Sequence, residues 1–165
     1  MNDAIEAAKR SLILREILVK SLSLDVSDRL NDTDEGLDVQ IAMRTGISKR
    51  RNIRDDTGAA VGIQYLYKCE IKLIDRSILE NPESSQEGEQ AEFKFEASFL
   101  ADYEMRDPIG DEAASIFGQV NVGYHVWPFW RELVQSTCNR VGITPISLPF
   151  YKPPKIQNRT EESAQ

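Results

Sequence analysis

Three segments of the chain alternate apolar and polar residues with a period of two, and this pattern constrains the fold more than any other feature. The second segment runs from Gly62 to Asp75 and the third from Glu92 to Arg106. Alternation this regular predicts antiparallel strands with one buried face and one solvated face. The first segment places its apolar residues on one parity, at Leu37, Val39, Ile41, Met43 and Ile47.

The N-terminal part is less clear. A short helix is expected around Asp3 to Arg10, and a further strand would place Leu14, Leu18, Leu22, Leu24 and Val26 on one parity. A helix from Ala4 to Ser21 competes for the same residues, and local pattern does not decide between them.

After Arg106 the period changes from two to between three and four, which predicts helices. The stretch "DPIGDEAASIFGQ" indicates a short helix, and a longer one begins near Tyr124, with Pro128 in its first turn and Gly142 as its C-terminal cap. The apolar segment "ITPISLPFYKPP" that follows is interrupted by prolines, so we expect an extended strap.

The order of elements predicts an α+β fold, a four-stranded antiparallel sheet followed by a short and a long helix packed on one face. We expect a single domain over residues 1–155 and a disordered tail over residues 156–165. The polar connections "SKRRNIRDDTGAA" and "NPESSQEGEQ" are expected to be exposed hairpin loops.

Composition and motifs argue against several functional classes. The net charge of −7 opposes nucleic-acid binding. Cys69, Cys138 and the single histidine, His125, match no metal-ligand or catalytic spacing, so we expect no metal, no cofactor and no enzymatic activity. No apolar run approaches the length of a membrane span, and no secretory signal is seen, so we expect a cytoplasmic protein without membrane insertion.

The chain nevertheless carries more large apolar side chains than a small core needs. Trp127 and Trp130 on the long helix, "PISLPF" in the strap and the apolar parity of the first alternating segment are the main contributors. Surface of this kind is covered by a partner subunit or by a bound client. A purely structural oligomer and a small-ligand pocket remain alternatives.

The stretch "VWPFWRELVQSTCNRVGITPISLP" resembles the long-helix region of SecB, the bacterial protein-export chaperone, and "LREILVKSLSLDVSD" and "AEFKFEASF" resemble its first and fourth strands. The residues that match the family pattern directly are Pro128, Phe129, Arg131, Glu132, Arg140 and Leu148. The resemblance implies an ATP-independent holdase, assembled as a dimer of dimers, that keeps unfolded polypeptides ready for export.

The resemblance also implies site residues. Clients would lie in a groove lined by strand two, the long helix and the strap, which here means Leu37, Val39, Ile41, Met43, Phe129, Trp130, Ile146, Leu148 and Phe150. Asp25 and Glu96 match acidic positions at which SecB proteins dock the export motor SecA, although Ser21 and Lys94 depart from that pattern. Divergent relatives instead protect the antitoxin of a toxin–antitoxin system, so an antitoxin is the alternative client.

Overall fold

A computed structural model describes residues 2–31, 38–76 and 91–153. Helix α1 (Asn2–Ser11) leads directly into β1 (Leu12–Val26), and a short 3₁₀ turn, η1 (Asp28–Asn31), follows. Strands β2 (Val39–Arg54), β3 (Ala60–Asp75) and β4 (Ala91–Met105) complete the sheet. The structure therefore decides the open question at the N-terminus: the helix ends at Ser11 and the strand begins at Leu12.

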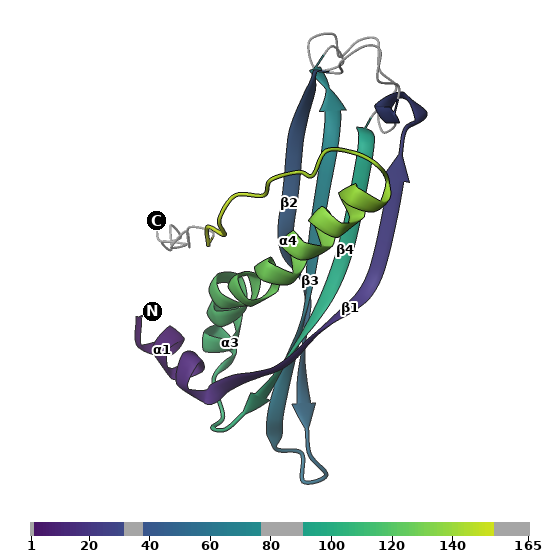
Figure 1. Cartoon of the computed structure of the whole chain (residues 1–165). Coiled ribbons are helices and arrows are strands. Elements are labelled where there is room, and N and C mark those ends of the chain that lie inside the picture. The colour runs from purple at the N-terminus through teal and green to yellow at the C-terminus, as the bar shows by residue number, and fades with distance from the viewer. Residues whose placement is uncertain (1, 32–37, 77–90, 154–165) are drawn as a thin grey trace, which may run out of the picture.

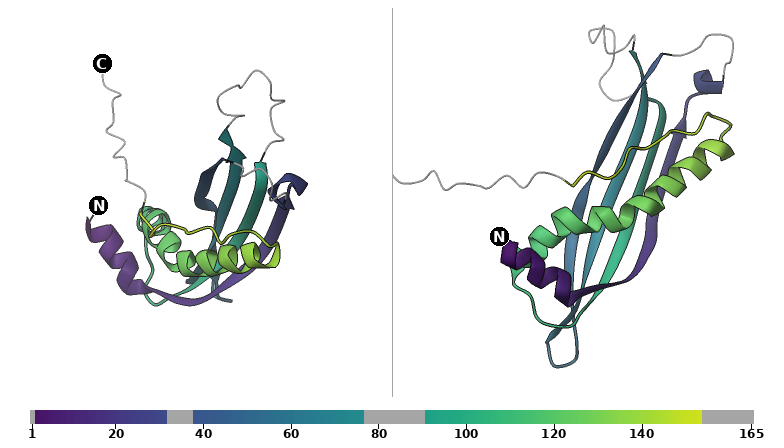
Figure 2. Two further views of the ribbon diagram at one scale, coloured as in Figure 1. Left: turned by 45° about the horizontal axis from the view of Figure 1, so that its top comes forward. Right: turned by 60° about the vertical axis from the view of Figure 1, so that its left-hand side comes forward.

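The four strands form one antiparallel sheet in the order β1-β4-β3-β2, which leaves β1 and β2 as its two edges (Figure 1). The helices and the strap, defined here as residues 143–153, gather on one face of the sheet (Figure 2). We call this the inner face and the opposite one the outer face. The predicted α+β class, strand number and helix placement are confirmed.

The inner face of the sheet is the core. Alternate residues of β3 and β4, including Ile63, Tyr65, Phe95 and Phe99, are almost fully buried under the helices. Trp130 from the long helix α4 (Gly123–Arg140) stacks on Phe95 with ring centroids 5.3 Å apart and meets Phe99 edge-on at 6.4 Å. The regular alternation in the sequence thus reflects burial of one face.

The helical segment after the sheet is continuous. It comprises α3 (Asp111–Phe117), one π-helical turn, η3 (Gly118–Val122), and α4 (Gly123–Arg140). Pro128 therefore lies inside the helix and not in its first turn as expected. Gly142, with φ of +77°, ends α4 in the left-handed conformation that a C-terminal cap requires, as predicted.

Two sequence-based boundaries need correction. Strand β2 extends to Arg54, so most of the segment "SKRRNIRDDTGAA" is strand and only the turn around Asp55 to Ala59 connects it to β3. In β1, register shifts between Leu14 and Glu16 and between Val19 and Ser21 change which parity faces inward. Leu18 is consequently on the outer face, opposite Leu100. The second predicted loop and the predicted disordered tail lie outside the described residues.

Candidate functional site: a pocket beside an open strand edge

Strand β2 is paired with β3 on one side, and no described strand pairs with its other side. Its inner-face residues Val39, Ile41 and Met43 oppose Asp75, Leu73 and Ile71 of β3. The side chains of Ile41 and Met43 are 51% and 41% exposed, because α4 crosses the sheet without covering them. An unpaired edge next to exposed apolar side chains is a surface on which another extended chain can add.

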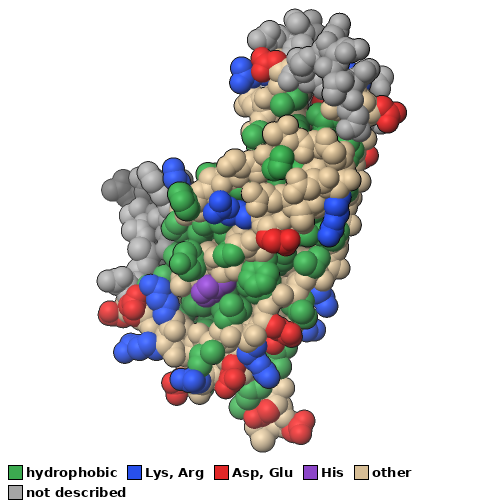
Figure 3. All heavy atoms as spheres, in the orientation of Figure 1, with side chains coloured by type: hydrophobic (Ala, Val, Ile, Leu, Met, Phe, Trp, Pro, Cys, Tyr) green, Lys and Arg blue, Asp and Glu red, His purple; other side chains and the backbone are tan. Residues whose placement is uncertain are grey.

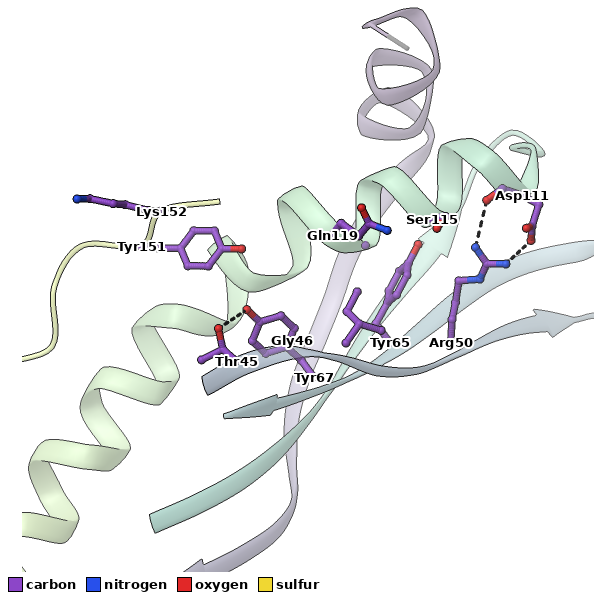
Figure 4. A pocket seen from close by; sticks show the side chains of 12 residues that line it. Thr45, Gly46, Arg50, Tyr65, Tyr67, Asp111, Ser115, Gln119, Tyr151 and Lys152 are labelled. Carbon is purple, nitrogen blue, oxygen red and sulfur yellow. Dashed lines mark hydrogen bonds and ion pairs between the residues drawn. The ribbon is translucent and has the colours of Figure 1, made fainter. Parts of the chain in front are cut away.

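A pocket of about 640 Å³ lies on the inner face beside this edge (Figure 4). Its floor is formed by β2 and β3, one wall by α3 and η3, and the other wall by the end of the strap. We call it the tyrosine pocket. Its lining residues are Thr45, Gly46, Ile47, Arg50, Tyr65, Tyr67, Asp111, Ser115, Gly118, Gln119, Tyr151 and Lys152.

Three tyrosines, Tyr65, Tyr67 and Tyr151, make the interior of the pocket aromatic. The hydroxyl of Tyr65 donates to the carbonyl oxygen of Ala114 at 2.7 Å, and that of Tyr67 donates to Thr45 Oγ1 at 3.2 Å. Tyr151 approaches Tyr67 from the strap (Figure 4). Burial raises the pKa of all three phenols, so they stay protonated and offer hydrogen bonds and ring faces without charge.

Two glycines allow the helical segment to approach these rings. A Cβ atom at Gly118 would lie 2.7 Å from both Ile47 Cδ1 and Tyr65 Cε1, and one at Gly123 would lie 2.6 Å from the Tyr67 hydroxyl. The π-helical turn η3 begins at Gly118 and ends immediately before Gly123. The local backbone is therefore shaped to hold the pocket wall against the sheet.

The rim of the pocket carries charge at both ends. The Arg50 guanidinium pairs with the Asp111 carboxylate and also donates to the Asp111 carbonyl oxygen at 3.1 Å. Lys152 on the strap makes no ion pair with any described residue. The pocket thus combines an aromatic interior with polar, partly cationic edges, which suits a large side chain attached to a solvated main chain.

The structure separates the predicted client-binding residues into two groups. Ile41, Met43, Phe129 and Phe150 are exposed, and Val39 is partly exposed. Leu37 lies outside the described residues. The Arg131 guanidinium is 5.8 Å from the centre of the Phe150 ring, which places strap and helix side by side at the surface. A client-binding role for these residues remains a prediction.

Trp130, Ile146 and Leu148 were expected at the groove surface but are buried in the core, with exposed fractions of 0%, 7% and 6%. The apolar stripe on α4 faces the sheet, so Trp130 fills the space between Phe95 and Phe99 while Phe129 points outward. Ile146 and Leu148 anchor the strap. In this conformation almost none of their surface is accessible to a client.

Sequence reasoning missed the pocket tyrosines, because Tyr65 and Tyr67 follow the same parity as the core. A signal was present: the aromatic residues on the inner face of β4 are Phe93, Phe95, Phe99 and Tyr103, whereas the middle of β3 has two tyrosines, Tyr65 and Tyr67, in succession on that face. A buried tyrosine hydroxyl needs a hydrogen-bond partner, which favours a position near polar groups. Arg50 was missed because it fell in a segment expected to be a loop.

Asp25 and Glu96, the predicted docking acids, both lie on the outer face. Lys94 lies opposite Asp25, and its ammonium is 3.0 Å from the Glu96 carboxylate and 3.9 Å from Glu70. The hydrogen bond from Lys94 lowers the pKa of Glu96, while Glu96 raises the pKa of Lys94. This lysine neutralises much of the negative potential that an acidic docking site would require.

The described residues contain no cluster of three or more metal-ligating side chains. His125 Nδ1 is 2.8 Å from the Tyr103 hydroxyl, and its ring lies beside Tyr103, Phe117 and Tyr124. Burial raises the pKa of the Cys69 thiol to about 12, so this cysteine is an unreactive core residue. None of the described helices is long and apolar enough to cross a membrane.

A second exposed apolar surface lies on β1. Leu14, Val19, Leu22 and Leu24 are between 37% and 54% exposed, although their β4 partners Tyr103, Phe99, Ala97 and Phe95 are buried. Hydrophobic side chains reach the surface at many points of the helix-bearing face (Figure 3). The sheet therefore has apolar side chains exposed at both of its edges.

A twisted antiparallel sheet of four long strands, crossed on one face by a long helix and closed by a returning strap, is a SecB-like fold. One solved example with this fold is the SecB-like chaperone Rv1957 of Mycobacterium tuberculosis, in complex with a ChAD peptide from the antitoxin HigA1. The TM-score is 0.67 at 11% sequence identity, over 92% of this chain and 99% of that one. No protein-family model and no curated protein matches this chain.

Proposed function

We propose that this protein is an ATP-independent holdase that binds extended segments of unfolded polypeptide. The observation that carries the proposal is the tyrosine pocket opening beside the edge of β2 with which no described strand pairs, next to the exposed side chains of Ile41 and Met43. The SecB-like fold supports it.

Capture needs no nucleotide, because burial of apolar surface drives it. An aromatic client side chain that enters the pocket buries about 150–250 Å². At roughly 25 cal/mol/Å² this contributes about 4–6 kcal/mol before the entropic costs of association. Main-chain hydrogen bonds to β2 do not depend on client sequence, so the combination gives tolerant binding.

Two kinds of client are compatible with this function, export precursors and a dedicated antitoxin. General capture of export precursors, with SecA receiving them, is the role that the sequence resemblance implies. A dedicated antitoxin client is favoured by two observations: the fold neighbour was solved with an antitoxin peptide, and Lys94 neutralises the Glu96 position. Affinity capture from native cytosol separates the two, since a general holdase retains many precursors and a dedicated one retains a single protein.

We further propose that the working form is a homo-oligomer in the cytoplasm, assembled as a dimer of dimers. The exposed leucines of β1 are too numerous to remain in water. Their pairing with a second copy leaves the opposite edge, β2, free for clients. Several client sites in one assembly add avidity to weak individual contacts.

The decisive experiment is suppression of aggregation, measured by light scattering as a denatured client is diluted into buffer. The double variant Ile41→Ser with Met43→Ser removes exposed apolar groups from the inner face of β2. The matched control, Gln40→Ser with Ala42→Ser, changes the same strand on its outer face. We expect the first variant to lose most suppression while keeping its oligomeric mass, and the control to behave as the parent.

Two other results would reject the proposal. If the parent chain does not suppress aggregation at stoichiometric amounts, the apolar surfaces serve only self-association. If the Ile41 and Met43 variant loses its oligomeric mass together with suppression, these residues belong to a subunit interface instead of a client site.

A further inference from the structure

Strand β2 has an unusual charge for a chain whose net charge is −7. Between Val39 and Arg54 it contains five basic residues and no acidic residue. The basic residues are Arg44, Lys49, Arg50, Arg51 and Arg54.

The register of the sheet shows which of these basic residues lie on the outer face and which lie on the inner face. Arg44 opposes Glu70, Lys49 opposes Leu66 and Arg51 opposes Gln64, all of which are outer-face positions of β3. Arg50 opposes the core residue Tyr65 and so lies on the inner face. The outer face of β2 is thus basic, while its inner face over Val39 to Ile47 is mainly apolar.

The outer-face cations are not neutralised by their neighbours. Arg50, on the inner face, pairs with Asp111, but Arg44, Lys49 and Arg51 form no ion pair with a described residue. Glu70, across from Arg44, is instead 3.4 Å from Lys72 and 3.9 Å from Lys94. The guanidinium of Arg51 bonds to the neutral side chain of Gln64.

A second hollow, of about 500 Å³, lies behind the same stretch of strand. Arg44, Lys68, Glu70 and Glu96 contribute charged groups to it, and Ser21, Ser98 and Gly46 contribute small ones. Thr45, Gly46 and Ile47 line both this outer hollow and the tyrosine pocket. The middle of β2 therefore has recessed space on both faces, and Gly46 has no atom within 4 Å of where a Cβ would be.

A strand that adds to β2 must follow the same two-residue alternation. Its inward side chains meet Ile41, Met43 and the tyrosine pocket, and its outward side chains meet Arg44, Lys49 and Arg51. Directly opposed side chains on neighbouring strands lie close enough to pair, and opposite charges stabilise the pairing.

We propose that the open edge of β2 selects acidic client segments, in which apolar or aromatic residues alternate with Asp or Glu. This inference rests on the proposed function, because it assumes that clients lie along β2. It adds a rule of specificity. The client side chains that point to the inner face supply affinity, and those that point to the outer face supply charge complementarity to the basic residues of β2.

The test uses two labelled peptides of equal length with the same alternating Trp, Val and Leu residues, separated by Glu in one peptide and by Lys in the other. Binding to the full-length protein is measured by fluorescence anisotropy at low and at physiological salt. We expect the Glu peptide to bind at least about tenfold more tightly at low salt, with a smaller difference as salt increases.

The variant Arg44→Glu with Arg51→Glu should remove or reverse the preference. The control, Arg106→Glu with Arg140→Glu, makes the same change in net charge at exposed positions outside β2 and should retain it. Equal affinities, or tighter binding of the Lys peptide to the parent protein, would overturn the inference.

Failure of the inference can be distinguished from failure of the holdase function. A protein that suppresses aggregation but shows no charge preference is a holdase without this rule. A protein that neither suppresses aggregation nor binds either peptide is no holdase. If a single-stranded oligonucleotide competes with the Glu peptide at equal affinity, the basic strand is a general polyanion site and the rule is also overturned.

Discussion

The indole N–H of Trp127 donates to the carbonyl oxygen of Pro149 at 3.0 Å, and this bond fastens the strap to the long helix. The Trp127 ring also lies 5.5 Å from that of Tyr151, the strap residue that closes the tyrosine pocket. The position of the pocket wall therefore depends on a residue of α4 that does not line the pocket. The hydrogen bond and the ring contact of Trp127 together hold the strap wall of the pocket in place.

Trp127→Phe should loosen the strap. The variant keeps an aromatic ring but leaves the Pro149 carbonyl without its donor, at a cost of about 1–3 kcal/mol in the free energy of unfolding. Chemical denaturation measures that loss, and limited proteolysis should show faster cleavage after residue 143.

Trp130→Phe is the matched comparison. The Trp130 indole nitrogen is buried and has no hydrogen-bond partner among the described residues. Its removal costs ring packing but no hydrogen bond, so proteolysis of the strap should be unchanged. Equal cleavage of the strap in both variants would contradict the conclusion that the hydrogen bond between Trp127 and Pro149 holds the strap on α4.

Gly123→Ala should disturb the tyrosine pocket. The added methyl group would overlap the hydroxyls of Tyr151 and Tyr67, the latter 2.6 Å away. We expect about 1–3 kcal/mol of destabilisation from overpacking, partly offset by roughly 1 kcal/mol of better helix propensity. Client affinity should fall as Tyr151 is displaced. Gly46→Ala, where no atom lies within 4 Å of the new methyl group, should change stability little.

The sheet was predictable because the inward residues of β3 and β4 are apolar along almost their whole length, whereas most of the outward residues are polar. Strand β1 was harder, since its two register shifts move Leu18 to the outer face while Leu14, Leu22 and Leu24 stay on the inner face. A register shift depends on pairing with β4, and the sequence of β1 alone carries no signal for it.

The candidate site was predictable only in part. Placing the edge of strand two next to the strap follows from the resemblance and from exposed apolar residues such as Ile41. The direction of Trp130 did not follow, because Phe129 and Trp130 are adjacent on a helix and either could face the sheet. The pocket depends on Tyr65, Tyr67 and Tyr151, which only the tertiary fold brings together.

The ion cluster of Arg29, Asp75 and Glu92 gives a prediction about stability. Arg29 in η1 is 3.2 Å from Asp75 and 2.9 Å from Glu92, whose carboxylates are buried at the ends of β3 and β4. Arg29→Ala removes the cation and leaves buried negative charge, so we expect a loss of about 2 kcal/mol in urea denaturation. Lys9→Ala, which breaks the exposed pair with Glu6, should cost less than about 0.5 kcal/mol.

His125 gives a prediction about pH. Burial lowers its pKa from the ordinary value of 6.5, so below that value the unfolded chain binds the proton more readily than the folded chain. Its contribution to stability is therefore complete above pH 6.5 and is lost as pH falls toward the folded pKa. Urea unfolding at pH 8 and pH 5.5 should show a smaller pH effect in His125→Gln than in the parent. An identical effect would exclude His125 as the source.

The exposed leucines of β1 lead to the prediction about assembly. Leu22 and Leu24 are 54% and 42% exposed on the inner face, at an edge with which no described strand pairs, and burying the exposed half of each leucine at an interface contributes about 1 kcal/mol. In a symmetric dimer each substitution occurs twice, so Leu22→Lys with Leu24→Lys should break the β1 interface of the dimer of dimers and reduce the mass of the assembly by at least half in light-scattering chromatography.

Ser21→Lys with Ser23→Lys adds the same charge on the outer face of the same strand and should leave the mass of the assembly unchanged. An 18.7 kDa parent protein would show that the β1 surface binds something other than a second copy. If only the leucine variant dissociates and its subunits still bind peptide, β1 serves assembly and β2 serves clients. That outcome assigns the two open edges of one sheet to two separate tasks.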